Sequence, residues 1–169
     1  PAPPLSLATR RAKERVTRDL KRRPNARTDL PEWTGSIKQG FQQELMQLAA
    51  DGKRLTPVHV VGRSPSLATG LPTVDSFLWR KLRAYAVGET VAARDRLAQV
   101  EPPRLAGEFQ VTFAALGAEL IVFLVIRDRI LGLLTLGPKV DGSPVPLDEV
   151  ETLVALGRQL SVVVRNASA

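Results

Sequence analysis

Cysteine is absent from this chain of 169 residues, and histidine occurs only once. Without cysteine the chain can hold no disulfide framework, no thiolate metal site and no thioether-linked chromophore. The single histidine, His59, excludes a multi-histidine metal centre and any catalytic design that needs a Cys–His pair or two imidazoles. It lies in the apolar run Val58-His59-Val60, where we interpret it as a strand histidine and not as a haem ligand.

Long apolar runs are missing as well. The longest runs from Leu120 to Ile126, seven residues that end at Arg127, whereas a membrane-spanning helix needs about 20. No secretory signal is visible at the start of the chain. We therefore expect a cytoplasmic protein, with tethering to the inner face of a membrane as a further option.

Charge is distributed unevenly along the chain. The first thirty residues hold nine basic and three acidic side chains, and the remainder holds 15 basic and 14 acidic ones. The body of the protein is thus nearly neutral, which argues against a diffuse nucleic-acid-binding face on it. The high isoelectric point belongs mostly to a basic N-terminal arm.

Within this arm, residues 7–23 have a helical pattern that ends at Pro24. The apolar stripe is narrow, so this helix must lie on a partner, on a neighbouring domain or in solvent. A solvated linker, an anionic lipid surface, a protein partner and non-specific nucleic acid all remain open, whereas specific nucleic-acid binding is disfavoured because no aromatics are interleaved. The basic side chains of the arm are Arg10, Arg11, Lys13, Arg15, Arg18, Lys21, Arg22 and Arg23.

Alternating helix and strand signals fill the rest of the chain. Capping residues, proline and glycine positions and the period of the apolar residues predict seven segments. In chain order these are a helix over 36–50, a hairpin of 56–61 with 66–69, a helix over 75–86 capped by Asp75 or Thr73, a short strand over 88–93, a helix from Pro102-Pro103 to Gly117, a hairpin of 119–126 with 130–136, and a helix over 147–167.

The last helix carries more apolar surface than one sheet can cover. At 100° per residue its apolar side chains fill about half the circumference, whereas a helix on a single sheet needs a stripe of a little over about 100°. The surplus, centred on Leu156, Val163 and Ala167, predicts a second partner, most simply another copy of the same helix. The predicted interface residues are Leu153, Leu156, Leu160, Val163 and Ala167.

Several segments of the C-terminal half resemble a known family. They are Ala118-Glu119-Leu120-Ile121-Val122, the run Ile130 to Lys139 with its Gly-Leu-Leu-Thr-Leu-Gly core, then Gly142, Pro144, Leu153, Gln159 and Asn166-Ala167. Together they resemble the second half of a GAF domain of the kind found in membrane-anchored bacterial sensor histidine kinases. The match is best over 100–169, weaker over 36–99, and does not include 1–30. The resemblance therefore divides the chain into a basic segment (1–30) and a GAF-like domain (31–169).

This resemblance implies an α+β fold. Its antiparallel sheet of five to six strands has the N- and C-terminal helices on one face and short helices and loops, which cover a ligand pocket, on the other. Some positions depart from the family: Phe123 replaces a usual proline, Asp128 a usual glycine, and Val145-Pro146 an aromatic residue and a capping hydroxyl. The Asn-Lys-x-Asp-Glu signature of the cyclic-nucleotide binders is also missing. These departures favour a domain kept for its shape and partners.

Candidate sites are few. Trp79, Phe109, Phe113 and Phe123 could line a pocket for a flat ligand, although residues at such helical and strand spacing more often form a core. The acids Asp148, Glu149 and Glu151 stabilise a helix N-terminus more readily than they perform acid–base catalysis. No nucleophile–base pair and no metal-ligand set is visible, so we expect no enzyme and no cofactor.

Two functions follow from these observations. The first is a non-catalytic sensory and dimerisation module of a bacterial signal-transduction protein, with partners at its terminal helices. The second is a structural or adaptor subunit that docks in a larger assembly through its basic arm. A pocket that senses a small aromatic or nucleotide ligand is a weaker third reading.

Overall fold

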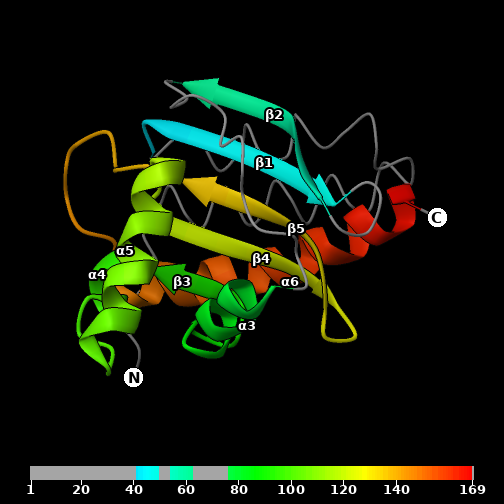
Figure 1. Cartoon of the computed structure of the whole chain (residues 1–169). Coiled ribbons are helices and arrows are strands. Elements are labelled where there is room, and N and C mark those ends of the chain that lie inside the picture. The colour runs from blue at the N-terminus through cyan, green and yellow to red at the C-terminus, as the bar shows by residue number, and fades with distance from the viewer. Residues whose placement is uncertain (1–40, 50–53, 63–75, 169) are drawn as a thin grey trace.

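The computed structural model describes residues 41–49, 54–62 and 76–168. In this part of the chain five antiparallel strands form one sheet, with the order β2-β1-β5-β4-β3 (Figure 1). The strands are β1 (Gln43–Ala49), β2 (Leu55–Gly62), β3 (Val91–Ala93), β4 (Leu120–Ile126) and β5 (Arg129–Leu136). The α+β class and the antiparallel sheet are therefore confirmed.

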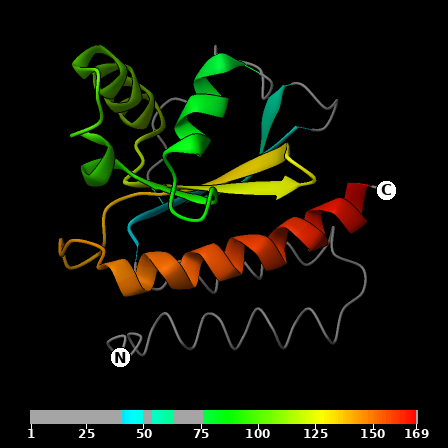
Figure 2. The same ribbon diagram turned by 90° about the horizontal axis from the view of Figure 1, so that it is seen from below.

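Helices cover both faces of this sheet. On one face lies the long helix α6 (Leu147–Ser168), which runs along β4 and β3. On the other lie α3 (Phe77–Ala84), α4 (Arg94–Leu97) and α5 (Pro103–Leu116), so the sheet separates two helical layers (Figure 2). This arrangement gives the domain two apolar cores, one on each side of the sheet.

Strand β4 contributes to both cores because successive side chains of a strand point to opposite faces. Leu120, Val122 and Leu124 are buried on the α6 side. Ile121 and Phe123 are buried on the side of α3 and α5. An apolar side chain at every position is what a central strand covered on both faces requires, and the sequence predicts it correctly here.

The helix boundaries follow local signals. Pro103 is the first residue of α5, and Gly117 ends this helix with φ +62°, a left-handed conformation that glycine adopts without strain. Both ends were predicted from the sequence. The cap of α3 is Ser76, whose hydroxyl accepts a hydrogen bond from the Trp79 amide at 3.4 Å, and not Asp75 or Thr73.

One sequence prediction in the N-terminal half is wrong. The segment predicted as a helix over 36–50 contains strand β1, which pairs with β2 on one side and β5 on the other. Strand β2 pairs with β1. The predicted hairpin partner 66–69 lies outside the described residues, so that hairpin stays a prediction. The short helix α4 was not predicted. Pairing on both sides explains β1: its backbone groups are satisfied by two neighbouring strands, which outweighs the helix propensity of its residues.

The basic arm lies outside the described residues, as does the predicted helix over 7–23. The proposed boundary between residues 30 and 31 therefore stays a prediction. No helix in the described ranges is long and apolar enough to cross a membrane.

Candidate functional site

The four aromatic side chains predicted to line a pocket come together on the side of the sheet opposite α6. Trp79 belongs to α3, Phe109 and Phe113 to α5, and Phe123 to β4. The rings of Trp79 and Phe123 meet edge to face, with their centroids 6.3 Å apart. Tyr85, just beyond α3, meets Phe109 in the same way at 5.9 Å. We call Trp79, Phe109, Phe113 and Phe123 the aromatic layer.

The aromatic layer is closed. Each of its four side chains is at most 1% exposed. A side chain beside a cavity large enough for water would show accessible surface there, and these rings show almost none. They pack against protein atoms, as core residues do, so a flat ligand could reach them only after neighbouring parts of the chain moved away.

The residues predicted as the interface of the last helix are buried in the single chain. Leu153 and Leu160 pack toward the sheet, and Leu156 and Val163, on the flank, are 1% and 2% exposed. The side chain of Ala167 lies outside the described residues. Since Leu156 and Val163 are already covered, burying them does not require a second copy of the helix.

Gly157 lets α6 approach the sheet closely. A Cβ atom placed on Gly157 would lie 2.7 Å from a methyl carbon of Val122 and 2.8 Å from the methyl carbon of Thr90. Real Cβ atoms essentially never approach other heavy atoms so closely. The helix therefore contacts β4 and the residue before β3 through its backbone at this turn, which only glycine allows.

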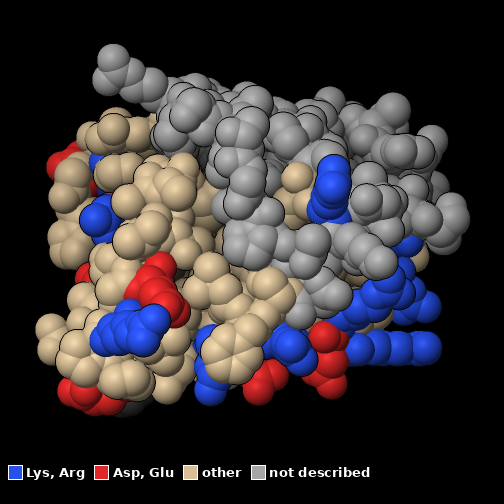
Figure 3. Space-filling view, in the orientation of Figure 1, with Lys and Arg blue, Asp and Glu red and all other residues tan. Residues whose placement is uncertain are grey.

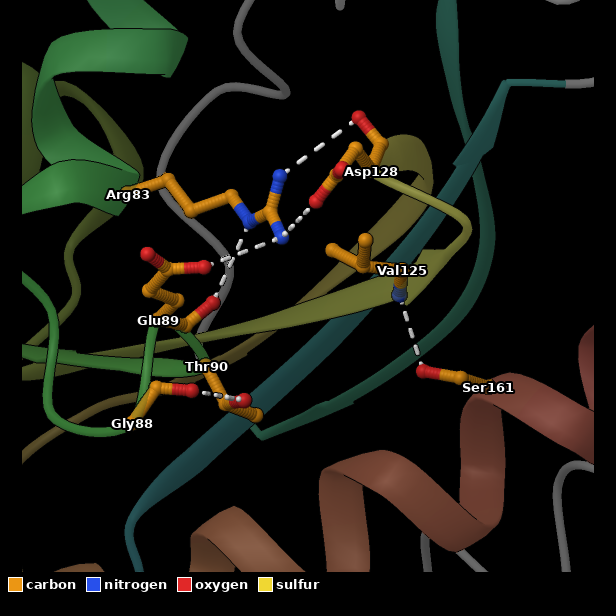
Figure 4. A network of polar contacts seen from close by, with 7 residues as sticks. All are labelled: Arg83, Gly88, Glu89, Thr90, Val125, Asp128 and Ser161. Carbon is orange, nitrogen blue, oxygen red and sulfur yellow. Dashed lines mark hydrogen bonds and ion pairs between the residues drawn. The ribbon is translucent and has the colours of Figure 1, made fainter.

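One turn later, Ser161 connects α6 to β4 by a hydrogen bond. The Val125 amide donates to the Ser161 hydroxyl at 2.8 Å (Figure 4). This hydroxyl in turn donates to the Gly157 carbonyl at 2.7 Å. The neighbouring amide on the same edge of β4, that of Phe123, donates to the carbonyl of Thr90. Among the described residues, β3 is short and pairs only with Leu120–Val122, so no described strand meets Val125 on this edge, and Ser161 takes that place.

On the other side of the sheet, Arg83 ties the end of α3 to two turns. Its guanidinium donates to the carbonyl of Glu89 at 3.3 Å and lies 3.2 Å from a carboxylate oxygen of Asp128 (Figure 4). Glu89, Arg127 and Asp128 have positive φ values of 52°, 50° and 63°, which are unfavourable for residues other than glycine. Arg83 thus holds two strained turns, the connection before β3 and the β4–β5 hairpin, against α3.

The start of α6 is fixed by an ion pair between Lys139 and Glu149. The two groups are 2.5 Å apart, and their side chains are only 16% and 6% exposed. Lys139 is positioned by the first residues of the sheet, since the Gln42 side chain donates to its carbonyl at 3.2 Å. Glu149, one of the acids singled out in the sequence, therefore joins α6 to the segment after β5.

The segment between β5 and α6 contains a second carboxylate with a defined role. Both the hydroxyl and the amide of Ser143 donate to Asp141, at 2.6 and 2.9 Å. These hydrogen bonds hold the pKa of the Asp141 carboxyl below its usual value, with a smaller contribution from the charge of Lys139. Asp141 is fully exposed, and its hydrogen bonds with Ser143 stabilise the turn between β5 and α6.

Among the described residues, no group of three or more His, Cys, Asp or Glu side chains could hold a metal ion. The basic-arm residues and the side chain of His59 lie outside the described part. The residues that connect the layers, Arg83, Lys139 and Ser161, were not singled out from the sequence. The sequence weakly indicates a role for Ser161, since it is a polar residue within the apolar stripe of α6, four positions after Gly157. It does not indicate the partners of Arg83, which are up to 45 positions away.

Comparisons with known proteins agree with this geometry. No protein-family model matches the chain, and no match to a curated protein is found. Among solved structures, the GAF domain of a cyanobacterial phytochrome with bound phycoerythrobilin is similar at 14% identity and a TM-score of 0.62, covering 96% of this chain and 97% of that one. A phycocyanobilin-bound GAF domain of a cyanobacterial phytochrome is similar at 17% identity and a TM-score of 0.61, with the same coverage.

A domain of a methyl-accepting chemotaxis protein, residues 122 to 287, is a further structural neighbour. It has 14% identity and a TM-score of 0.58, and the match covers 92% of this chain and 96% of that one. At these identities the likeness concerns the fold alone. The fold of this chain is therefore that of the GAF domains, as the resemblance in the sequence implied.

Proposed function

We propose that this chain is a non-catalytic sensory module of a bacterial signal-transduction protein of the two-component type. In this proposal a change in packing on the α3 and α5 side of the sheet alters the position of α6, and α6 passes this change to an attached output. The GAF fold supports the proposal at the level of the protein class, because its structural neighbours include a chemotaxis protein and two phytochrome domains.

One observation carries the proposal: β4 contacts both layers at once. Phe123 meets Trp79 of the aromatic layer, while the adjacent Val122 meets Gly157 of α6. Two residues further along the strand, Val125 is hydrogen-bonded to Ser161. A displacement of β4 caused by the aromatic layer would therefore reach α6 without an intervening flexible segment, because packed cores respond as contiguous units.

Replacing Trp79 with phenylalanine tests this coupling. The smaller ring leaves space beside Phe123, so β4 is expected to shift, and the backbone amide resonances of Val125, Gly157 and Ser161 should move in ¹H–¹⁵N spectra. The matched control is Phe77→Ala on the same helix, where the side chain is 65% exposed and its removal should leave these resonances unchanged.

The two variants separate coupling from a local change. Trp79→Phe could move the resonances of β4 while those of Gly157 and Ser161 keep their parent positions. The displacement of β4 would then not reach α6, and the sensory proposal would be wrong. That result would favour the alternative function, a structural or adaptor subunit, which the closed aromatic layer supports because such a subunit needs no space for a ligand.

Dimerisation through the terminal helices is part of the proposal. Since Leu156 and Val163 are already buried, a second copy would contact α6 on its exposed side, where Val162 is 49% exposed. Sedimentation equilibrium of the chain decides this point: a dimer weakened by Val162→Glu supports the contact, and a monomer at every concentration rules it out.

A further inference from the structure

Charge is separated in space although it is nearly balanced in the described sequence. Residues 76–168 hold eleven Lys or Arg side chains and ten Asp or Glu side chains. Seven of the basic side chains, but only two of the acidic ones, belong to α3, the turn before β3, the β4–β5 turn and the second half of α6. The basic ones are Arg80, Lys81, Arg83, Arg127, Arg129, Arg158 and Arg165. We call this region the basic end.

Contacts join these elements into one region. Arg83 binds Asp128, which connects α3 to the β4–β5 turn. Val125, just before this turn, binds Ser161, one helical turn before Arg165. Arg158 lies beside Gly88 of the turn before β3, because a Cβ atom on Gly88 would be 3.4 Å from its guanidinium. Lys and Arg side chains gather at the lower right of Figure 3, where the β4–β5 turn projects in Figure 1.

The two carboxylates of the basic end do not neutralise it. Both Asp128 and Glu89 lie within ion-pair distance of the same group, the guanidinium of Arg83. Arg127, Arg129, Arg158 and Arg165 have no carboxylate partner among the described residues. The other elements of residues 76–168 hold eight of the ten acidic side chains but four of the eleven basic ones, so charge in this range is arranged as an electric dipole. Such a dipole orients a protein against a negatively charged surface.

We propose that the basic end lies against an anionic phospholipid bilayer. The β4–β5 turn projects from the domain, and its two exposed arginines fit a flat, diffuse negative surface better than a single phosphate in a cradle. Nucleic-acid binding is the outcome that the test must distinguish.

The test compares two charge-matched double variants of the full chain. Arg127→Gln with Arg165→Gln removes two charges from the basic end, whereas Arg96→Gln with Arg104→Gln removes two exposed charges elsewhere. Co-sedimentation is measured with phosphatidylcholine vesicles that contain about 30% phosphatidylglycerol, which gives the bilayer a negative surface potential. The N-terminal arm is identical in all three proteins, so its contribution cancels in the comparison.

We expect the parent chain to bind these vesicles, with binding lost in pure phosphatidylcholine and reduced at high salt. The first double variant should bind roughly 25-fold more weakly, since each basic residue near an anionic surface contributes about a factor of five. The second should bind within about twofold of the parent, because its arginines lie outside the contact. Equal losses in both variants, or no binding by the parent, would overturn the proposal. A parent chain that binds a single-stranded oligonucleotide but no vesicles would also overturn the proposal. If only the first double variant then loses the oligonucleotide, the ligand of the basic end is nucleic acid.

Discussion

Replacing Lys139 with alanine is expected to lower the free energy of unfolding by about 3–5 kcal/mol. The substitution leaves the carboxylate of Glu149 buried without its partner, since that side chain is only 6% exposed. A buried charge without a partner costs far more than the pair itself contributes. Urea unfolding followed by circular dichroism measures the change, with the slope of the transition checked for two-state behaviour.

An exposed ion pair provides the control. Arg104 and Glu108 are 3.9 Å apart on α5, and their side chains are 91% and 54% exposed. Arg104→Ala should therefore change the free energy of unfolding by less than about 0.5 kcal/mol. The double variant Lys139→Met with Glu149→Leu should recover most of the stability, because it removes both charges. A loss for Lys139→Ala no larger than that for Arg104→Ala would mean that Glu149 does not need Lys139.

Alanine at the two glycines within the described helices, Gly107 and Gly157, should have opposite effects. Gly157→Ala is expected to lower the free energy of unfolding by about 1–3 kcal/mol, since the new methyl group would overlap Val122 and Thr90. Gly107→Ala in α5 should raise it by up to about 1 kcal/mol, because no atom lies within 4 Å of the new methyl group and alanine favours the helix.

Both glycines have helical backbone conformations, one in α5 and one in α6. The difference between the two changes in the free energy of unfolding therefore reports the contact between α6 and the sheet. Thermal unfolding of both variants in one buffer gives the two signs directly. If Gly157→Ala stabilises the protein as Gly107→Ala does, α6 lies farther from β4 than the structure places it.

Elements with agreeing local signals could be predicted from the sequence. The hairpin of β4 and β5, helix α5 between its proline and glycine, and helix α6 each combine a clear apolar period with a definite start or end. Strand β1 could not be predicted, because its residues Gln43–Ala49 favour a helix and become a strand only through pairing with β2 and β5.

The candidate site was predicted only in part. The members of the aromatic layer could be named because they occupy apolar positions on elements that the sequence predicts. In the structure the four side chains belong to one buried cluster. The connections made by Arg83, Lys139 and Ser161 join positions far apart in the sequence, and charged or hydroxyl side chains carry no period that would reveal their partners. The basic end could not be predicted for the same reason. Acidic and basic residues alternate along the sequence, and they are separated in space only when the chain folds.

We infer that α6 is held against β4 by packing and by a hydrogen bond, so that the two elements move together. Hydrogen exchange of the Val125 amide in the parent and in Ser161→Ala tests it most directly, with the Phe123 amide of the same strand as an internal reference. The Phe123 amide donates to the carbonyl of Thr90, a bond in which Ser161 takes no part. We predict that Val125 is protected in the parent and that Ser161→Ala accelerates its exchange at least about tenfold more than that of Phe123. Fast exchange of Val125 in the parent, or equal acceleration of both amides, would contradict the claim.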